Sequence, residues 1–342
     1  MSESQVAVVI LNWNGQKYLE QFLPSVIQNS GNAKIVVADN ASTDNSVEFV
    51  QKNYPEIELV INSENGGFAK GYNDALKNVN AEFYMLLNSD IEVTPNWLAP
   101  LIEQMKDPQV AGCQPKVKAY NSQVSFEHAG ASGGFLDRNY FPFCRGRIFN
   151  SIETDFGQYN GVSEIFWASG ACLLIRSELF HNAGGFDEAF FAHMEEIDLC
   201  WRLKKMNYKF MVCPSSTVYH IGGGTLPYTS PRKVYLNFRN SIMMLIKNHE
   251  GVLLPKLFTR LCIDGIAAIR FLMIGEFKQF NAVWRAHFFA YGNMKTLLKK
   301  RKAIKNASTT FNATGLYKGS ILTAYFFKGI TEYSKLNQRL FK

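Results

Sequence analysis

Asp39 is the first residue of the chain whose position suggests chemistry. It directly follows the apolar run KIVVA, which is typical of a buried strand, so its carboxylate is expected at a strand end. A carboxylate there can accept a hydrogen bond from a ring N–H or a ribose hydroxyl group. The alternative is a cap for the following helix, but Ser42, Thr43 and Asp44 are better placed for capping. We therefore predict that Asp39 binds a ligand.

Asp90 and His220 are candidate ligands of a divalent metal ion. Asp90 follows the apolar run FYMLL and two polar residues, whereas His220 ends the run STVYH and precedes three glycines. One carboxylate with one imidazole can hold Mg²⁺ or Mn²⁺ when diphosphate oxygens complete the coordination. The alternatives are a turn aspartate and a structural histidine. The glycines favour the metal site, because backbone without side chains can approach phosphates closely.

Glu195, Glu196 and Asp198 open a predicted helix after an aromatic-rich run. The helix dipole alone also favours acids in a first helical turn. Successive helical residues point about 100° apart, so at most two of these acids can face one pocket. A glutamate beside aromatic surface can have a raised pKa, which suits a general base that deprotonates a hydroxyl group.

The elements that must position these residues alternate between strand and helix. A helical period follows each of the first three predicted strands, and the four strands lie at 6–11, 34–38, 59–62 and 83–87. This rhythm predicts an α/β fold with a doubly wound, mostly parallel sheet, in which ligands gather at the carboxyl ends of the strands. The glycine-rich turn at 66–71 lacks the G-x-G-x-x-G spacing and follows the third strand, which argues against a nicotinamide coenzyme.

The net charge changes sign along the chain. Residues 231–342 hold 20 lysines and arginines but four acids, a net charge of +16, so the first 230 residues carry −9 of the total of +7. We predict a domain at 1–230 and a basic, amphipathic helical extension at 231–342, with KKRK at 299–302, that lies on an anionic membrane surface. The alternative is a solvated appendage packed on the domain or at a dimer interface. Nucleic-acid binding is not expected, because no known binding module is present.

The N-terminus and the cysteines favour a reducing compartment. No basic segment with a cleavage site precedes the first strand, so no signal peptide is expected. No run reaches the ~18 apolar residues of a membrane-spanning helix. The six cysteines form no C-x-x-C pair and mostly lie in apolar segments, as reduced, buried thiols do.

Seven segments resemble, in order, the bacterial rhamnosyltransferase-like members of glycosyltransferase family 2, which have the GT-A fold, a Rossmann-like doubly wound sheet. They are spread over about two-thirds of the chain: VVILNWNG (8–15), VADNASTDNS (37–46), ENGGFAKGYNDAL (64–76), LLNSDIEV (86–93), WASGACLLIR (167–176), GGFDEAFFAHMEEIDLCWRLKKMNY (184–208) and VYHIGGGT (218–225). The resemblance implies an inverting, metal-dependent hexosyltransferase. It would move rhamnose or another hexose from a nucleoside-diphosphate sugar to a hydroxyl group of a cell-surface glycan or lipid-linked precursor, in cell-wall or polysaccharide biosynthesis.

The same resemblance implies roles for single residues. Mg²⁺ or Mn²⁺ would be held by His220 and by Asp90, the surviving acid of a D-x-D motif. Glu196 stands where the family has its catalytic base, usually an aspartate, and Glu195 lies beside it. The acceptor would be bound by Trp167, Gly170 and Asp198, in a part at about 116–230 that also carries catalysis. The nucleotide sugar would be bound within about 1–115, by Asn12, Asp39, Asn65, Gly67, Asn88 and Ser89, and Asn88 replaces the first aspartate of the D-x-D motif.

Two alternatives belong to other classes. A non-catalytic nucleotide-sugar or carbohydrate-binding protein on a GT-A scaffold is disfavoured by the joint presence of Asp39, Asp90, Glu196 and His220. A processive synthase would need spanning helices and a Q-x-x-R-W motif, which the sequence lacks. We expect a cytoplasmic enzyme, peripheral on the inner face of the cell membrane. The sugar, the nucleotide, the acceptor and the oligomeric state, a homo-oligomer included, are left open.

Overall fold

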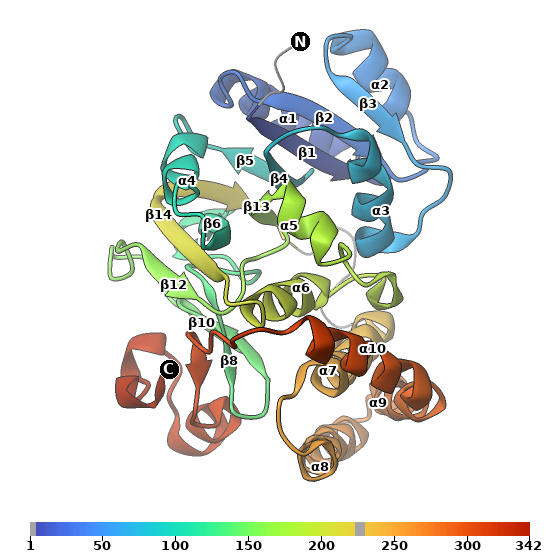
Figure 1. Cartoon of the computed structure of the whole chain (residues 1–342), viewed down its shortest axis with the longest axis vertical. Coiled ribbons are helices and arrows are strands. Elements are labelled where there is room, and N and C mark those ends of the chain that lie inside the picture. Colours follow the sequence, from blue (N-terminus) through green and yellow to red (C-terminus); the bar gives the residue numbers. More distant parts are fainter. Residues whose placement is uncertain (1–4, 223–229) are drawn as a thin grey trace.

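The computed structural model describes residues 5–222 and 230–342. Within them the main sheet has ten strands, in the order β12-β14-β6-β13-β4-β1-β2-β3, with β5 paired to β14 and β7 paired to β6 (Figure 1). The strands are β1 (Val6–Asn12), β2 (Lys34–Asp39), β3 (Glu58–Ile61), β4 (Phe83–Asn88), β5 (Ile91–Val93), β6 (Val110–Ala119), β7 (Ser122–Phe126), β12 (Ser163–Ile165), β13 (Cys172–Arg176) and β14 (Lys209–His220).

The first four strands form the parallel part of this sheet. β1 pairs in parallel with β2 and β4, and β2 pairs in parallel with β3. The register sets Asn12 opposite Asp39 and Leu11 opposite Asn88. Three predicted site residues therefore lie at one edge of the sheet. Beyond β4 the sheet is mixed, because β13 runs antiparallel to both β4 and β6.

Helices cover both faces of the sheet, which confirms the doubly wound α/β prediction. Alternate residues of β1 point to opposite faces, Val8 and Ile10 into one hydrophobic cluster and Ala7 and Val9 into the other. The first cluster includes side chains of α1 (Gln16–Asn29), α2 (Ser46–Asn53) and α4 (Leu98–Gln104). The second includes side chains of α3 (Gly67–Ala75), α5 (Ser177–Asn182) and α6 (Glu195–Lys204).

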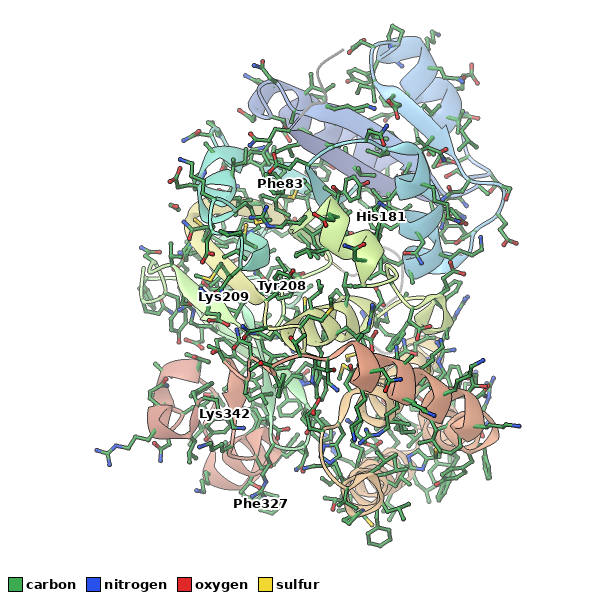
Figure 2. All side chains as sticks on the ribbon, viewed as in Figure 1. Phe83, His181, Tyr208, Lys209, Phe327 and Lys342 are labelled. Carbon is green, nitrogen blue, oxygen red and sulfur yellow. The ribbon has the colours of Figure 1, made fainter. Side chains whose placement is uncertain are left out.

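A second, five-stranded sheet lies beside the first. Its order is β11 (Ser151–Ile152), β10 (Arg147–Ile148), β9 (Pro142–Cys144), β8 (Gly134–Asp137) and β15 (Leu316–Tyr317). β15 pairs in parallel with β8 although about 180 residues separate them in the chain. The C-terminal segment thus returns to this sheet and ends at Lys342 beside it (Figure 2). The long helices of the predicted extension end at Ala307, and the described residues beyond it form β15 and short helical segments such as Thr323–Phe327.

The helical part of the C-terminal region comprises α7 (Pro231–Asn248), α8 (Leu253–Met273), α9 (Phe277–Gly292) and α10 (Met294–Ala307). α7 begins where Ser230 Oγ accepts a hydrogen bond from the amide of Lys233, with proline at the first helical position. Its residues 242–246 are buried in the same hydrophobic cluster as α3 and α6. α7 therefore packs into the core of the sheet domain, and the domain boundary at residue 230 stays a prediction.

No helix in the described part of the chain is long and apolar enough to span a membrane. All six cysteines are free thiols, and five of them are buried, as expected. Cys262 differs from that expectation, because it is exposed on α8.

Candidate active site

Asn12 and Asp39 meet at the carboxyl ends of β1 and β2. Asn12 Nδ2 donates to Asp39 Oδ1 at 3.0 Å, and the Ser42 amide donates to Asp39 Oδ2 at 2.8 Å. Asn12 Oδ1 is a buried acceptor without a hydrogen-bond partner in the described part of the chain. A Cβ atom on Gly15 would lie 2.5 Å from this oxygen and 3.5 Å from Ser89 Oγ. The absence of that atom keeps the space between Asn12 and Ser89 open.

An asparagine network holds the glycine-rich turn against these strand ends. Asn40 Nδ2 donates to Asn65 Oδ1 at 3.0 Å, and Asn62 Nδ2 donates to Asn40 Oδ1 at 3.1 Å. Asn65 Oδ1 also accepts from the Gly67 amide at 3.0 Å. Gly67 has a φ of +82°, and a Cβ atom there would lie 2.5 Å from the Phe191 carbonyl oxygen. The turn therefore touches the loop that precedes α6.

Asp90 and His220 come together although 130 residues separate them. β5 pairs with β14 so that His220 lies opposite Ile91, the residue after Asp90. His220 Nε2 lies 3.1 Å from Asp90 Oδ1 and 3.5 Å from Asn88 Nδ2. His220 Nδ1 lies 3.3 Å from Glu127 Oε2. The imidazole is thus enclosed between two carboxylates, one at each nitrogen.

These neighbours shift the pKa values of all three groups. Burial alone would lower the pKa of His220, but hydrogen bonds and charges of Asp90 and Glu127 raise it to about 10. Burial alone would raise the pKa of both carboxyl groups, and the contact with His220 lowers it instead. A histidine whose second nitrogen faces a carboxylate is the usual arrangement of a metal-bound imidazole.

Glu127 is a site residue that the sequence did not reveal. It lies in the irregular region 115–165, where weak periodicity gave no reason to single out one acid. Since Glu127 faces Nδ1 and Asp90 faces Nε2, the three groups do not surround one point. Accordingly, no group of three or more His, Cys, Asp or Glu in the described residues could hold a metal ion by itself. The glycines 223 and 224, predicted to approach phosphates, lie outside the described residues.

The loop before β13 joins this cluster to α6. The Asn88 amide donates to the Ala171 carbonyl at 2.9 Å, and Ser169 Oγ donates to the Ala129 carbonyl at 2.8 Å. A Cβ atom on Gly170 would lie 3.5 Å from Glu196 Cβ and 3.3 Å from Phe68 Cζ. Gly170 is therefore the closest approach between this loop, the glycine-rich turn and the start of α6.

Trp167 precedes the same loop but points away from it. Its side chain is buried, and its indole Nε1 donates to the Phe135 carbonyl at 3.0 Å. A Cβ atom on Gly134 would lie 2.1 Å from the indole ring, so the ring packs on the backbone of the second sheet. The predicted contact of Trp167 with an acceptor is not supported by this position.

Glu195 and Glu196 begin α6 in different surroundings. Glu195 is buried and Glu196 is half-buried, and Oε2 of each has no hydrogen-bond partner in the described part of the chain. Burial raises the pKa of Glu196 to about 7 despite hydrogen bonds from backbone amides. Burial and the charge of Glu196 raise the pKa of Glu195 well above its usual range. Burial thus favours the protonated form of Glu195, whereas Glu196 can gain or lose a proton near neutral pH.

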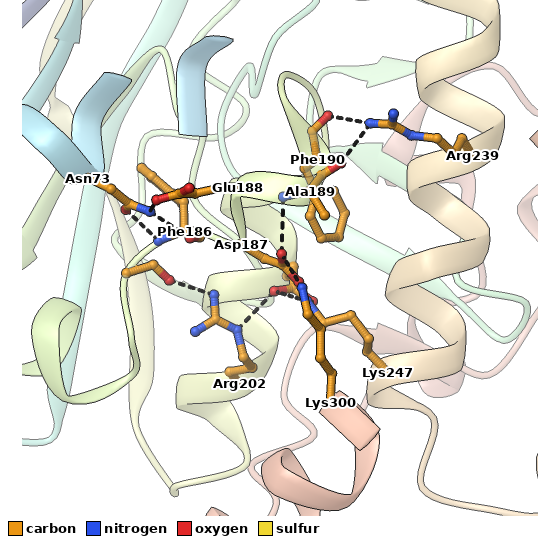
Figure 3. Close-up of polar contacts among 12 residues, drawn as sticks. Asn73, Phe186, Asp187, Glu188, Ala189, Phe190, Arg202, Arg239, Lys247 and Lys300 are labelled. Atoms are coloured by element: carbon orange, nitrogen blue, oxygen red, sulfur yellow. Dashed lines mark hydrogen bonds and ion pairs between the residues drawn. The ribbon is translucent and has the colours of Figure 1, made fainter. Parts of the chain in front are cut away.

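The loop before these glutamates has a strained backbone that α7 holds in place. Phe191, His193 and Met194 all have φ between 63° and 73°. Asn240 Nδ2 lies 2.7 to 3.0 Å from the carbonyl oxygens of residues 190, 192 and 193. Arg239 Nη2 donates to the carbonyl groups of residues 189 and 190 (Figure 3). These contacts offset the cost of the left-handed conformations.

Asp198 takes part in this attachment to α7 and does not line the site. Its side chain has no exposed surface, and it binds Lys247 Nζ at 2.9 Å, Asn248 Nδ2 at 2.7 Å and Arg202 Nε at 2.9 Å. Burial alone would raise its pKa, and the charges of Lys247 and Arg202 lower it. The acceptor contact of Asp198 stays a prediction that this buried position does not support. The residue faces away from Glu196 because the two lie two positions apart on a helix.

The Asn240→Ala variant is expected to lose both stability and activity. It removes the donor for buried carbonyl groups, which costs about 1 to 3 kcal/mol of unfolding free energy. It also loosens the loop that orients Glu196, so we expect kcat to fall at least about tenfold with little change in the KM of the donor. Urea unfolding and steady-state kinetics measure both effects, with Asn281→Ala on the exposed side of α9 as the control. Equal kcat values for Asn240→Ala and Asn281→Ala would show that α7 does not position the base.

The sequence model of glycosyl transferase family 2 matches residues 7–182, just over half of the chain. The N-acetylglucosaminyl-diphospho-decaprenol L-rhamnosyltransferase of Mycobacterium tuberculosis is 23% identical, over 71% of this chain and 85% of the relative. The dTDP-rhamnosyl transferase RfbF of Shigella flexneri is 24% identical, over 73% of this chain and 83% of the relative.

Solved structures show the same fold. The crystal structure of GalNAc-T7 with UDP, GalNAc and Mn²⁺ superimposes with a TM-score of 0.64 at 16% identity, over 91% of this chain. The chain spans 55% of the GalNAc-T7 chain, so this likeness concerns the fold alone. It confirms the GT-A prediction.

Proposed function

This chain belongs to glycosyl transferase family 2, and from that premise we propose an inverting sugar transfer in which Glu196 is the catalytic base. One observation carries the proposal: the Glu196 carboxyl group is half-buried beside Gly170, has a pKa of about 7, and keeps one oxygen without a partner in the described residues. A base that titrates near neutral pH suits removal of a hydroxyl proton during attack.

The donor is a nucleoside-diphosphate sugar, with L-rhamnose or another hexose as the transferred group. The relatives named as rhamnosyltransferases support rhamnose, and the name of RfbF supports a thymidine nucleotide. Asp39 and Asn12 contact the nucleoside at the ends of β1 and β2. The free acceptor Asn12 Oδ1 supports this assignment, because a buried carbonyl oxygen needs a donor that a ring N–H or ribose hydroxyl group would supply. Asn65 acts through Gly67, whose turn it holds.

Asp90 and His220 would hold Mg²⁺ or Mn²⁺, with Asn88 and Ser89 beside them. The carboxylate of Asp90 suits a hard divalent cation, and His220 would bind the ion after losing the proton that its raised pKa favours. Glu127 supplies the carboxylate at the far nitrogen that orients a metal-bound imidazole. The bound ion would neutralise negative charge on the leaving diphosphate. Two protein ligands suffice for such an ion because diphosphate oxygens complete its shell. The Mn²⁺ in the GalNAc-T7 structure supports this choice of metal.

Glu196 takes the proton of the acceptor hydroxyl group as its oxygen attacks the anomeric carbon from the face opposite the leaving group. The anomeric configuration is therefore inverted, and no covalent enzyme intermediate is needed. Burial and the charge of Glu196 raise the pKa of Glu195 well above its usual range, which favours the protonated form of that carboxyl group. Gly170 leaves room for the acceptor next to the base, because any side chain there would approach Glu196 and Phe68.

The acceptor is a hydroxyl group of a cell-surface glycan precursor carried on a lipid, at the inner face of the cell membrane. The M. tuberculosis relative, whose name specifies a diphospho-decaprenol acceptor, supports a lipid-linked substrate. The net charge of +16 on residues 231–342 supports contact with anionic lipids. Truncation of the chain near Ser230 is a poor test of that contact, because it would remove α7 and its hold on the loop before Glu196.

A panel of UDP-, GDP- and dTDP-linked hexoses, with Mn²⁺, tests donor binding. We expect one member, dTDP-L-rhamnose or a relative, to raise the melting temperature, since a ligand that binds only the folded state stabilises it. In Asp39→Asn the same donor should bind about tenfold more weakly, because one charge-assisted hydrogen bond is lost. Asp107→Asn, on the exposed surface, is the matched control. If no donor binds, the proposal is wrong. If a donor binds and is never consumed, the non-catalytic alternative is correct.

A further inference from the structure

α8 buries an ion pair together with two apolar residues, Leu257 and Ala268, and exposes a broad apolar face. Its buried face holds the Arg260–Asp264 ion pair, with Nε and Oδ1 2.8 Å apart and both side chains almost fully buried. Its opposite face carries five large apolar residues with exposures between 57% and 81%, here called the α8 stripe: Leu254, Phe258, Ile266, Ile269 and Met273. They recur at helical spacing and so form one face. A water-facing helix has the reverse pattern, so the natural surroundings of this face are not water.

α9 continues the exposed apolar surface beyond the turn. Ile274, Phe277, Trp284 and Phe288 are exposed by 42% to 66%, whereas the residues of α9 that contact neighbouring helices are mostly small. α8 lies at the lower end of the long axis of the molecule in Figure 1, and Phe327, which is 86% exposed, lies at the same end in Figure 2. Monomeric proteins in water rarely expose contiguous apolar patches beyond a few hundred Å². This end of the molecule therefore indicates a docking surface.

The charges around the stripe select an anionic partner. Arg270, Lys278 and Arg285 are exposed on α8 and α9. Three of the four acids in residues 231–342 are paired: Asp264 is buried with Arg260, Glu250 pairs with Lys205, and Glu332 pairs with Lys335. The fourth, Glu276, is half-buried in the turn between α8 and α9, where the three exposed cations outnumber it. A second copy of the chain would bring the same positive charge, which opposes self-association through this face. An anionic bilayer offers both the negative charge and the apolar interior that the surface requires.

We propose that the α8 stripe inserts into the boundary between headgroups and acyl chains of an anionic membrane. This inference rests on the proposed lipid-linked acceptor and deepens it by naming the contact. Half of the basic cluster at 299–302 is engaged within the protein, because Lys300 Nζ pairs with Asp187 Oδ1 at 2.6 Å and Arg301 donates to the carbonyl groups of Ile246 and Gly251. Lys299 and Lys302 are exposed and add positive charge to the same region. α8 and α9 pack on α7. The membrane contact is therefore joined, through α7, to the loop that precedes Glu196.

Flotation or sedimentation with phosphatidylglycerol–phosphatidylcholine vesicles tests the stripe. The full chain should bind these vesicles, bind phosphatidylcholine vesicles far more weakly, and dissociate as salt is added. The double variant Phe258→Asn with Ile266→Asn should bind at least about tenfold more weakly, because two large apolar groups no longer enter the bilayer. Both positions are exposed, so the fold should be unaffected. The matched control is Phe156→Asn with Ile152→Asn, exposed residues of the same types beside the second sheet, which should bind like the unaltered chain.

Vesicle binding by Phe258→Asn/Ile266→Asn equal to that of the unaltered chain would overturn the inference. So would a dimer of the unaltered chain that this variant converts to a monomer, since the stripe would then be an interface between copies. Hydrolysis of the soluble donor, measured on the same samples, separates this inference from the proposed function. Donor hydrolysis without vesicle binding refutes the membrane contact alone, and vesicle binding without donor hydrolysis refutes the transfer reaction alone.

Discussion

The Glu196→Gln variant is expected to lower kcat about 1,000-fold while the KM of the donor changes little. Glutamine keeps the size of the side chain and removes its ability to accept a proton, and general base catalysis contributes about 10² to 10⁴ in rate. The unaltered enzyme should show activity that rises with pH through about 7, because Glu196 must be ionised to act and burial raises its pKa to that value. Initial rates measured from pH 5 to pH 9 test this rise in activity, and the variant should not show it.

Glu195→Gln is the control for this prediction. Burial and the charge of Glu196 raise the pKa of Glu195 well above its usual range, and glutamine resembles the protonated form that this shift favours. We expect a loss of at most a few-fold, because glutamine also keeps the volume of the side chain. A large loss in Glu195→Gln with a small loss in Glu196→Gln would reverse the assignment of the base. If kcat fell equally little in Glu195→Gln and Glu196→Gln, neither glutamate at the start of α6 would be the general base.

The Asp90→Asn variant is expected to lower kcat/KM about 100- to 1,000-fold at a fixed Mn²⁺ concentration. Only one carboxylate of this loop is a candidate ligand, because Asn88 stands in the other acidic position, and asparagine is a far weaker ligand for a divalent cation. Chelation with EDTA should abolish the activity of the unaltered enzyme, and Mn²⁺ should restore it. Titration of activity against Mn²⁺ should place the half-saturation of the variant at least about tenfold higher.

Glu127→Gln should weaken metal binding less than Asp90→Asn does. Glu127 faces the nitrogen of His220 that is turned away from Asp90, so its loss should weaken metal binding about 10- to 100-fold without removing a ligand. Asp107→Asn, on the exposed surface beside Lys209, should titrate like the unaltered enzyme. Activity that survives EDTA, or identical Mn²⁺ titrations for Asp90→Asn and Asp107→Asn, would contradict the metal site.

The parallel half of the site was predictable from the sequence. Apolar runs of strand length followed by polar residues placed Asn12, Asp39 and Asn88 at strand ends, and parallel pairing brought those ends to one edge. The pairing of Asp90 with His220 was a hypothesis from their residue types and the neighbouring glycines, and the family resemblance supported it. It arises from the antiparallel register of β5 and β14, which local patterns do not encode.

Sequence patterns could not predict which side chains bind backbone carbonyl groups far away in the chain. Asn240 looks like any polar residue within an amphipathic helix, and its role depends on the left-handed loop that it meets about 50 residues earlier in the chain. The acceptor role of Asp198 was implied by the family resemblance, which gives the place of a residue in a motif and not the contacts of its side chain. Periodicity likewise did not show that α8 buries the Arg260–Asp264 ion pair and exposes its largest apolar side chains.

The most direct test of the central claim is the configuration of the released sugar, followed by proton NMR as the enzyme consumes its nucleotide sugar in the presence of Mn²⁺. Even without the natural acceptor, water can take the place of the hydroxyl group, and the first product can be observed before mutarotation. The account predicts that the anomeric proton of the donor disappears and that a product of the opposite configuration forms first, at a rate that Glu196→Gln lowers sharply. A donor that is never consumed, or a first product with retained configuration, would contradict it.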